Sequence, residues 1–182
     1  MTRTLLYGGS FDPPHIAHVQ LPHAAMISLG FDRVLYVPSS QSPLKGEPHT
    51  RDTHRLAMLE LALTECTWAE ISTVELERGG TSYTIDTIES LLQDEDELRL
   101  LIGADQWTQF KRWRRWEDIL RLANPAIMPR DGSEVCDERL LHIDSHPGVS
   151  SDIRTILKQD KSLNDVVAPM VLKYIAEHQL YL

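Results

Sequence analysis

Residues 8–18 read GGSFDPPHIAH, and this stretch decides how the surrounding chain folds. It overlaps RTLLYGG (3–9), a short apolar run that predicts a buried strand ended by glycines. Glycine lets the backbone approach a ligand closely, and Ser10 adds a hydroxyl donor. The run IAHVQLPHAAMISLG (16–30) has apolar residues at helical spacing and ends at a glycine. Pro22 lies inside this predicted helix and is expected to kink it or to lie in its first turns.

The turn between this strand and this helix has the features of a phosphate site. A helix that begins near His15 directs its free N–H groups and its positive dipole end at the turn, which favours phosphate. His15 and His18 are three residues apart, so both rings can face one side of the first helical turn. Two histidines can also indicate a metal site, but metal pairs on a helix are more often four residues apart and no third ligand is evident. We therefore predict a phosphate cradle with two imidazole donors and no metal site.

Strands and helices alternate along the rest of the chain. Further strands are predicted at 32–38, 69–78, 98–105, 125–130 and 139–144. Further helices are predicted at 50–65, 81–94, 116–123, 150–159 and 165–179. This order is typical of an α/β fold of the Rossmann-like, doubly wound type, with a mainly parallel sheet and helices on both faces. We expect one domain over residues 1–182, with ligands beyond the carboxyl ends of the strands.

Composition argues against several classes of protein. The chain has 182 residues and a formal net charge of -9, whereas a protein that binds nucleic acid usually carries a basic surface. KRWRRW (111–116) mixes cations and aromatic rings as single-strand binders do, but one short segment does not change this expectation. Cys66 and Cys136 are far apart and predict reduced thiols. No apolar run approaches membrane-spanning length and no signal peptide is evident, so we expect a cytoplasmic protein with neither a membrane nor a nucleic-acid partner.

Two motifs are recognisable. GGSFDPPHIAH resembles the GG[ST]FDPxHxGH signature of the nucleotidylyltransferase superfamily, and VSSDIR (149–154) resembles its second signature, ISSTxIR. Within that superfamily the chain is similar to the bacterial nicotinate mononucleotide adenylyltransferases. The segments that carry this similarity are RLAMLELA (55–62), VELERGGTSYT (74–84), LLIGADQW (100–107), PR (129–130) and VLKYIAEHQLYL (171–182).

Three positions depart from the family pattern. Ala17 stands where the family usually has glycine, and Leu44 stands where histidine is common. VSSDIR is one residue short before its serines, so Ser151 matches the family threonine. None of these departures removes His15 or His18, so we expect them to affect rate and affinity more than the type of reaction.

The resemblance implies transfer of AMP from ATP to the 5′-phosphate of nicotinate mononucleotide. The products are nicotinate adenine dinucleotide and pyrophosphate. The attacking phosphate is already an anion, so the reaction needs no general base and depends on alignment and on donors that stabilise charge at the α-phosphorus. Mg²⁺ is the expected cofactor, because it neutralises the pyrophosphate that leaves.

The resemblance also implies roles for individual residues. His18 is expected to donate to the α-phosphate in the transition state, and the full predicted catalytic set is His18, His15, Arg154 and Lys45. Residues predicted to bind ATP and its phosphates are Gly8, Gly9, Ser10, Phe11, His15, His18, Gly103, Asp105, Ser150, Ser151 and Arg154. Residues predicted to bind nicotinate mononucleotide are Ser10, Lys45, Tyr83, Thr84, Asp105, Trp113 and Arg114. On this prediction the C-terminal helices, within 150–182, complete the nucleotide site.

Two alternatives stay open at this point. The chain can be another nucleotidylyltransferase of the superfamily, for instance one that adenylates phosphopantetheine, although SYT (82–84) and the C-terminal segment argue against it. It can also be a non-catalytic nucleotide-binding protein that kept the fold, although the intact pair of His15 and His18 argues against that. Release of pyrophosphate would distinguish the two classes.

Overall fold

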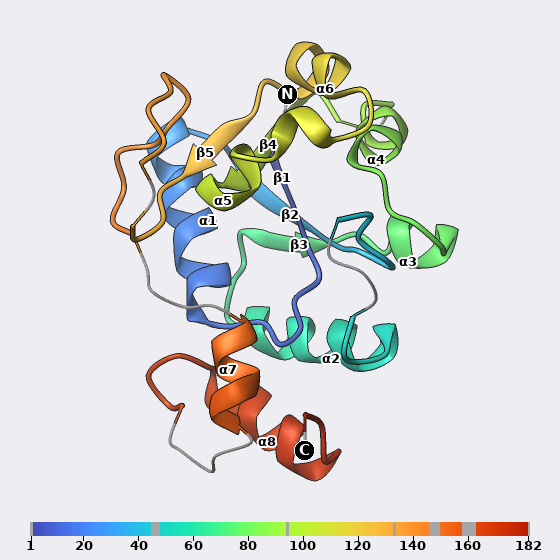
Figure 1. The fold of residues 1–182 in the computed structure, drawn as a ribbon, viewed down its shortest axis with the longest axis vertical. Helices are drawn as coiled ribbons and strands as arrows, with labels where there is room; N and C mark the ends of the chain where they lie inside the picture. The colour runs from blue at the N-terminus through green and yellow to red at the C-terminus, as the bar shows by residue number, and fades with distance from the viewer. Residues whose placement is uncertain are drawn as a thin grey trace.

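The sheet at the centre of the molecule is parallel throughout (Figure 1). The computed structural model describes residues 2–44, 48–93, 95–132, 134–145, 150–157 and 163–181. Its strands are β1 (Arg3–Gly9), β2 (Arg33–Pro38), β3 (Ala69–Ile71), β4 (Glu97–Gly103) and β5 (Ala126–Met128). They form a 5-stranded sheet in the order β3-β2-β1-β4-β5, which confirms the predicted doubly wound fold.

Helices cover both faces of this sheet. They are α1 (Ile16–Leu29), α2 (Asp52–Leu63), α3 (Val74–Arg78), α4 (Thr84–Leu91), α5 (Ala104–Trp107), the 3₁₀ helix η1 (Phe110–Arg112), α6 (Trp116–Ala123), α7 (Ser150–Leu157) and α8 (Pro169–Glu177). Because side chains alternate along a strand, each central strand feeds two cores. Leu5 and Tyr7 of β1 pack against α1 and α2, whereas Leu6 packs against α4 and α6. Within the described chain, no helix is long and apolar enough to cross a bilayer.

A further apolar cluster joins the C-terminal helices to α2. Met58 of α2 packs with Ile153 of α7 and with Val171 and Ile175 of α8, and all four side chains are buried. Figure 1 shows α7 and α8, in orange and red, beside α2 and away from α4 and α6. This packing brings the amino end of α7 to the loop that follows β1.

Three predicted elements differ from the structure. The strand predicted at 69–78 ends at Ile71, and the remaining VELER forms α3, because valine, leucine, glutamate and arginine can also build one helical turn before Gly79 (φ +67) ends it. The strand predicted at 139–144 is reduced to one bridge, between Leu140 and Ile127. The last helix begins at Pro169 rather than at 165, since proline is favoured at the first helical position.

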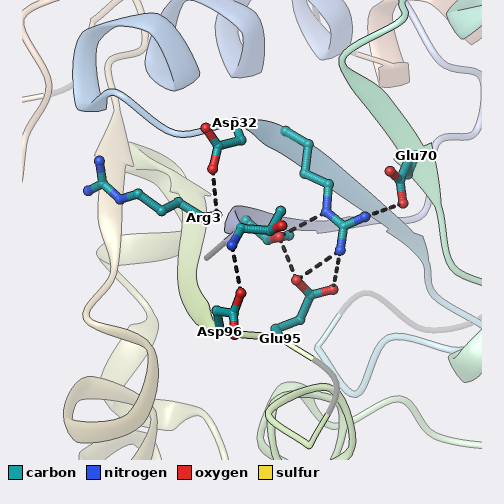
Figure 2. Close-up of polar contacts among 8 residues, drawn as sticks. Arg3, Asp32, Glu70, Glu95 and Asp96 are labelled. Atoms are coloured by element: carbon teal, nitrogen blue, oxygen red, sulfur yellow. Dashed lines mark hydrogen bonds and ion pairs between the residues drawn. The ribbon is translucent and has the colours of Figure 1, made fainter.

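Charged side chains link the amino ends of the strands, at the end of the sheet opposite to Gly8 and Gly9 (Figure 2). Arg33 of β2 donates to Glu95 at 2.7 Å, to Glu70 at 2.6 Å and to the hydroxyl of Thr4 at 2.9 Å. Thr4 in turn donates to Glu95 at 2.6 Å. This network links β1, β2, β3 and the segment before β4, so the amino end of the sheet is held by polar contacts and the carboxyl end stays open.

Candidate active site

The strand order reverses between β1 and β4, and such a switch point is where doubly wound sheets bind ligands. From β1 the sheet continues through β2 and β3 on one side and through β4 and β5 on the other. Gly8 and Gly9 end β1 and Ser10 follows it, whereas Gly103 ends β4. Two pockets open at these strand ends, one over each face of the sheet.

The first, here called the α1-side pocket, has a volume of about 340 Å³. Tyr7 and Met128 line it from the sheet, and both belong to the core under α1 and α2. It gathers all the residues predicted for ATP except Phe11, which are Gly8, Gly9, Ser10, His15, His18, Gly103, Asp105, Ser150, Ser151 and Arg154. Ala17, the residue that departs from the family glycine, lines the same pocket.

The second, here called the α4-side pocket, has a volume of about 250 Å³. Leu6 and Ile102 line it from the sheet, on the face covered by α4 and α6. It gathers the described residues that were predicted for nicotinate mononucleotide, which are Ser10, Tyr83, Thr84, Asp105, Trp113 and Arg114. Lys45, predicted for the same ligand and for catalysis, lies outside the described residues.

Phe11 lines neither pocket, because its ring is buried in the core with 1% of its surface exposed. A Cβ at Gly9 would lie 3.0 Å from the Phe11 ring, so a larger residue here would crowd that ring. The ring meets the imidazole of His18 edge-on, with centroids 5.2 Å apart. The Phe11 side chain therefore supports the histidine, and only its backbone amide is left for the phosphate contact that the sequence predicted.

The spacing of the two histidines has a structural cause. His15 is the N-cap of α1 and His18 is the third residue of the helix. The backbone N–H of His15 donates to Nδ1 of His18 at 3.2 Å, so Nδ1 carries no proton and the proton of the neutral ring sits on Nε2. The two rings lie 3.7 Å apart between centroids. This geometry presents Nε2–H of His18 as a fixed donor at the positive end of a helix.

Helix α7 is bonded directly to the loop after β1. The Ser150 hydroxyl donates to the Pro13 carbonyl at 3.1 Å, and Nη1 of Arg154 donates to the Asp12 carbonyl at 2.6 Å. Ser150 and Arg154 thereby reach the α1-side pocket from a helix far away in sequence.

Asp12 is a buried junction that the sequence analysis did not single out. Its side chain is 2% exposed, and its two carboxylate oxygens accept from the Tyr181 hydroxyl at 2.6 Å and from the His49 backbone N–H at 2.7 Å. Burial, followed by the bond to Asp12, raises the pKa of the Tyr181 phenol, so it stays protonated and donates. The C-terminal segment is thus fastened to the loop that leads from β1 into the helix of the two histidines.

Arg55 of α2 is a second residue that sequence reasoning missed. Its side chain is fully buried and donates to the carbonyls of Ser10 and Ser39, each at 2.6 Å. These two residues follow β1 and β2, so one guanidinium holds the ends of both strands. The signal in the sequence is that Arg55 shares a helical face with the buried Met58 and Leu59, where a cation needs internal partners.

The amino end of α4 faces the α4-side pocket. Tyr83 is the N-cap and Thr84 the first residue of this helix, and the N–H groups of Thr84 and Ile85 precede the first backbone bond of the helix, which Asp86 donates to the Tyr83 carbonyl at 3.1 Å. The Arg114 guanidinium lies 4.8 Å from the centre of the Tyr83 ring, and Trp113 lines the same space. An aromatic wall, a cation and backbone amides are together suited to a flat anionic ring.

Glu75 of α3 is a buried acidic group of this pocket. It is 7% exposed and accepts from the Thr87 hydroxyl at 2.6 Å. Burial raises the pKa of the Glu75 carboxyl, although the bonds from Thr87 and Ser82 oppose the shift. The carboxyl is therefore easier to protonate than that of a free glutamate.

Asp105 lines both pockets and lies between them. Gly103, and not Asp105, is the N-cap of α5. The Asp105 carboxylate forms an ion pair with Arg130 at 2.9 Å, and Arg130 lines the α1-side pocket. Arg130 had no predicted role, and the structure makes it a cation of the α1-side pocket.

The chain is similar in sequence and in fold to known proteins. A family model described as cytidylyltransferase-like matches residues 6–169. A relative from Herpetosiphon aurantiacus, named probable nicotinate-nucleotide adenylyltransferase, is 35% identical over 199 residues, with 100% of each chain covered. A relative of the same name from Bordetella avium is 36% identical over 195 residues, covering 100% of this chain and 98% of its own. The fold is shared with the nicotinic acid mononucleotide adenylyltransferase of Plasmodium falciparum complexed with NaAD, at a TM-score of 0.80, 20% identity and coverage of 100% and 98%.

Proposed function

We propose that this chain, which belongs to the cytidylyltransferase-like family, transfers AMP from ATP to nicotinate mononucleotide. The products are nicotinate adenine dinucleotide and pyrophosphate, and the reaction is a step in NAD biosynthesis. The observation that carries the proposal is the pair of pockets that meet over Gly8, Gly9 and Ser10 beside His18. Relatives matched over their full length and named for this activity support it.

ATP occupies the α1-side pocket in this proposal, and nicotinate mononucleotide occupies the α4-side pocket. Their phosphates meet at Gly8, Gly9 and Ser10, which line both pockets. An oxygen of the mononucleotide phosphate forms a bond to the α-phosphorus of ATP. The bond from that phosphorus to the oxygen bridging the α- and β-phosphates breaks, and pyrophosphate leaves with the electron pair. The protein contributes alignment of two polyanions, which would otherwise repel each other.

His18 supplies the donor at the reacting phosphorus. Its Nε2–H is fixed because the His15 backbone N–H occupies Nδ1, so the donor needs little reorganisation when negative charge develops. The positive end of α1 acts in the same direction. Arg154, which lines the same pocket, binds the triphosphate.

Mg²⁺ enters as part of the nucleotide substrate. Among the described residues no group of three His, Cys, Asp or Glu side chains is arranged to hold a metal ion. Phosphate oxygens and water are the ligands that Mg²⁺ normally keeps in such sites, so the triphosphate itself holds the ion. The ion supplies charge neutralisation for the pyrophosphate that leaves.

Recognition of the pyridine ring falls to the α4-side pocket. The backbone N–H groups at the start of α4, that of Thr84 among them, donate to the carboxylate of nicotinate. Trp113 provides a surface for its ring. Arg114 adds positive charge beside Tyr83. We place the reaction in the cytoplasm, as expected from the sequence.

The test is release of pyrophosphate from ATP and Mg²⁺ with nicotinate mononucleotide, nicotinamide mononucleotide or phosphopantetheine as acceptor. Fastest turnover with nicotinate mononucleotide is expected. Turnover only with phosphopantetheine would replace the proposal with another adenylyltransferase. ATP binding without pyrophosphate release from any acceptor would favour a non-catalytic nucleotide-binding protein.

A further inference from the structure

Helix α1 contains a proline four residues after the histidine that the mechanism depends on. Pro22 lies inside the helix and is buried. In an α-helix the carbonyl of residue 18 accepts from the N–H of residue 22, and proline has no N–H to give. The carbonyl of His18 therefore needs a donor from elsewhere, because an unsatisfied buried carbonyl is costly.

Tyr36 of β2 provides that donor. Its hydroxyl donates to the His18 carbonyl at 2.9 Å, and its side chain is fully buried. The ring is held by Tyr7 and Phe11, with centroid distances of 5.6 and 5.9 Å. Burial holds the pKa of the Tyr36 phenol well above its usual value, so the hydroxyl stays protonated and keeps donating.

We propose that Tyr36 is a positioning residue for catalysis, which supplies the hydrogen bond that Pro22 removes and so fixes the peptide of His18. The inference rests on the proposed function, because it assigns His18 as the donor to the α-phosphate. Two of the hydrogen bonds that hold His18 are then the one from Tyr36 to its carbonyl and the one from the His15 backbone N–H to its Nδ1. Without the bond from Tyr36, the His18 peptide turns toward another donor and the His18 ring moves away from the His15 amide.

The test begins with Tyr36→Phe, which removes one hydroxyl and keeps the ring. We expect kcat to fall about tenfold while KM for each substrate changes by less than about twofold, since misplacing a reacting group by an ångström can lower rate about a hundredfold. The ¹⁵N resonance of His18 Nδ1 should also shift, because its bond to the His15 amide weakens. This resonance can be read without turnover.

Pro22→Ala provides the rescue, because alanine at position 22 restores an N–H to the His18 carbonyl. The double variant Tyr36→Phe/Pro22→Ala should recover kcat to within about threefold of Pro22→Ala alone, as expected when two sites act on one group. Tyr174→Phe is the matched control. Tyr174 lies on α8 and lines neither pocket, and its phenol hydroxyl is hydrogen-bonded to His54 at 2.9 Å. The kcat of the Tyr174→Phe variant should stay within about twofold of wild type.

Two results would overturn the inference. One is a Tyr36→Phe variant with wild-type kcat, and the other is a loss of kcat that Pro22→Ala does not reverse. Failure of the proposed function is a separate outcome, since it would be seen as absence of turnover in the wild-type protein. The ¹⁵N shift of His18 would still decide whether Tyr36 positions the ring.

Discussion

Replacing Arg55 by methionine should destabilise the protein strongly, because its guanidinium is fully buried and holds two loops. The substitution keeps most of the side-chain volume but leaves the carbonyls of Ser10 and Ser39 without the donor at 2.6 Å that each has now. An orphaned buried carbonyl costs about 1–3 kcal/mol, which gives about 2–6 kcal/mol for the pair. Relief of the buried charge offsets part of this, and Asp52 adds little because its side chain is 43% exposed and can be hydrated. We expect a net loss of about 3 kcal/mol.

The assay is urea unfolding followed by circular dichroism, with thermal unfolding alongside. A loss of about 3 kcal/mol corresponds to a drop of roughly 6–12 °C in Tm for a chain of this size. Arg55→Lys should lose about half as much, because a point donor reaches one carbonyl where the planar fork reaches two. Arg121→Met is the matched control: this arginine is 68% exposed and pairs with Asp118, so its change should stay within about 0.5 kcal/mol. A loss under about 1 kcal/mol for Arg55→Met would refute the reasoning.

Three further predictions concern the pockets. His18→Ala should lower kcat about a hundred- to a thousandfold while calorimetry still detects ATP binding, and a variant within about threefold of wild type would contradict the donor role. The ratio of kcat/KM for the acid over the amide mononucleotide should be well above one, since amides near Thr84 pair with a carboxylate but oppose an NH₂ group; a ratio near one would mean that the ring lies elsewhere. The raised pKa of Glu75 makes folding favour the protonated form, so its contribution to stability is full below about pH 4.3 and is lost as pH rises through the raised value. Glu75→Gln should therefore raise Tm near pH 7 by more than it does near pH 4, and equal changes at both would contradict this.

Local patterns in the sequence predicted most of the fold. The glycine-ended strand and the helix after His15 lie in short segments and are found in the structure, and so is most of the later alternation of strands and helices. VELER misled because Val74 and Leu76 alternate with Glu75 and Glu77, which is typical of a strand. In the structure Glu75 is buried, since its partner hydroxyl on Thr87 comes from another helix.

The candidate site divides in the same way. Residues carried by a motif, such as His18 and Arg154, lie together around the α1-side pocket. The residues that hold the site depend on partners that no local pattern announces. Arg55 donates to backbone carbonyls 45 and 16 positions away. Every residue has such a carbonyl, so the sequence does not indicate which two will accept from Arg55. Only the folded chain shows that they are those of Ser10 and Ser39.

The contact between Asp12 and Tyr181 joins residues 169 positions apart, which affects the chain while it is being synthesised. A ribosome adds about 5–20 residues per second, so roughly 10–30 s pass between the making of these two partners. In that time β1 and β2 can already pair, but the loop from β1 to α1 has neither the phenol of Tyr181 nor the cation of Arg154. In a nascent chain the loop that leads into the histidine-bearing helix thus stays unfastened until α7 and α8 have emerged and docked.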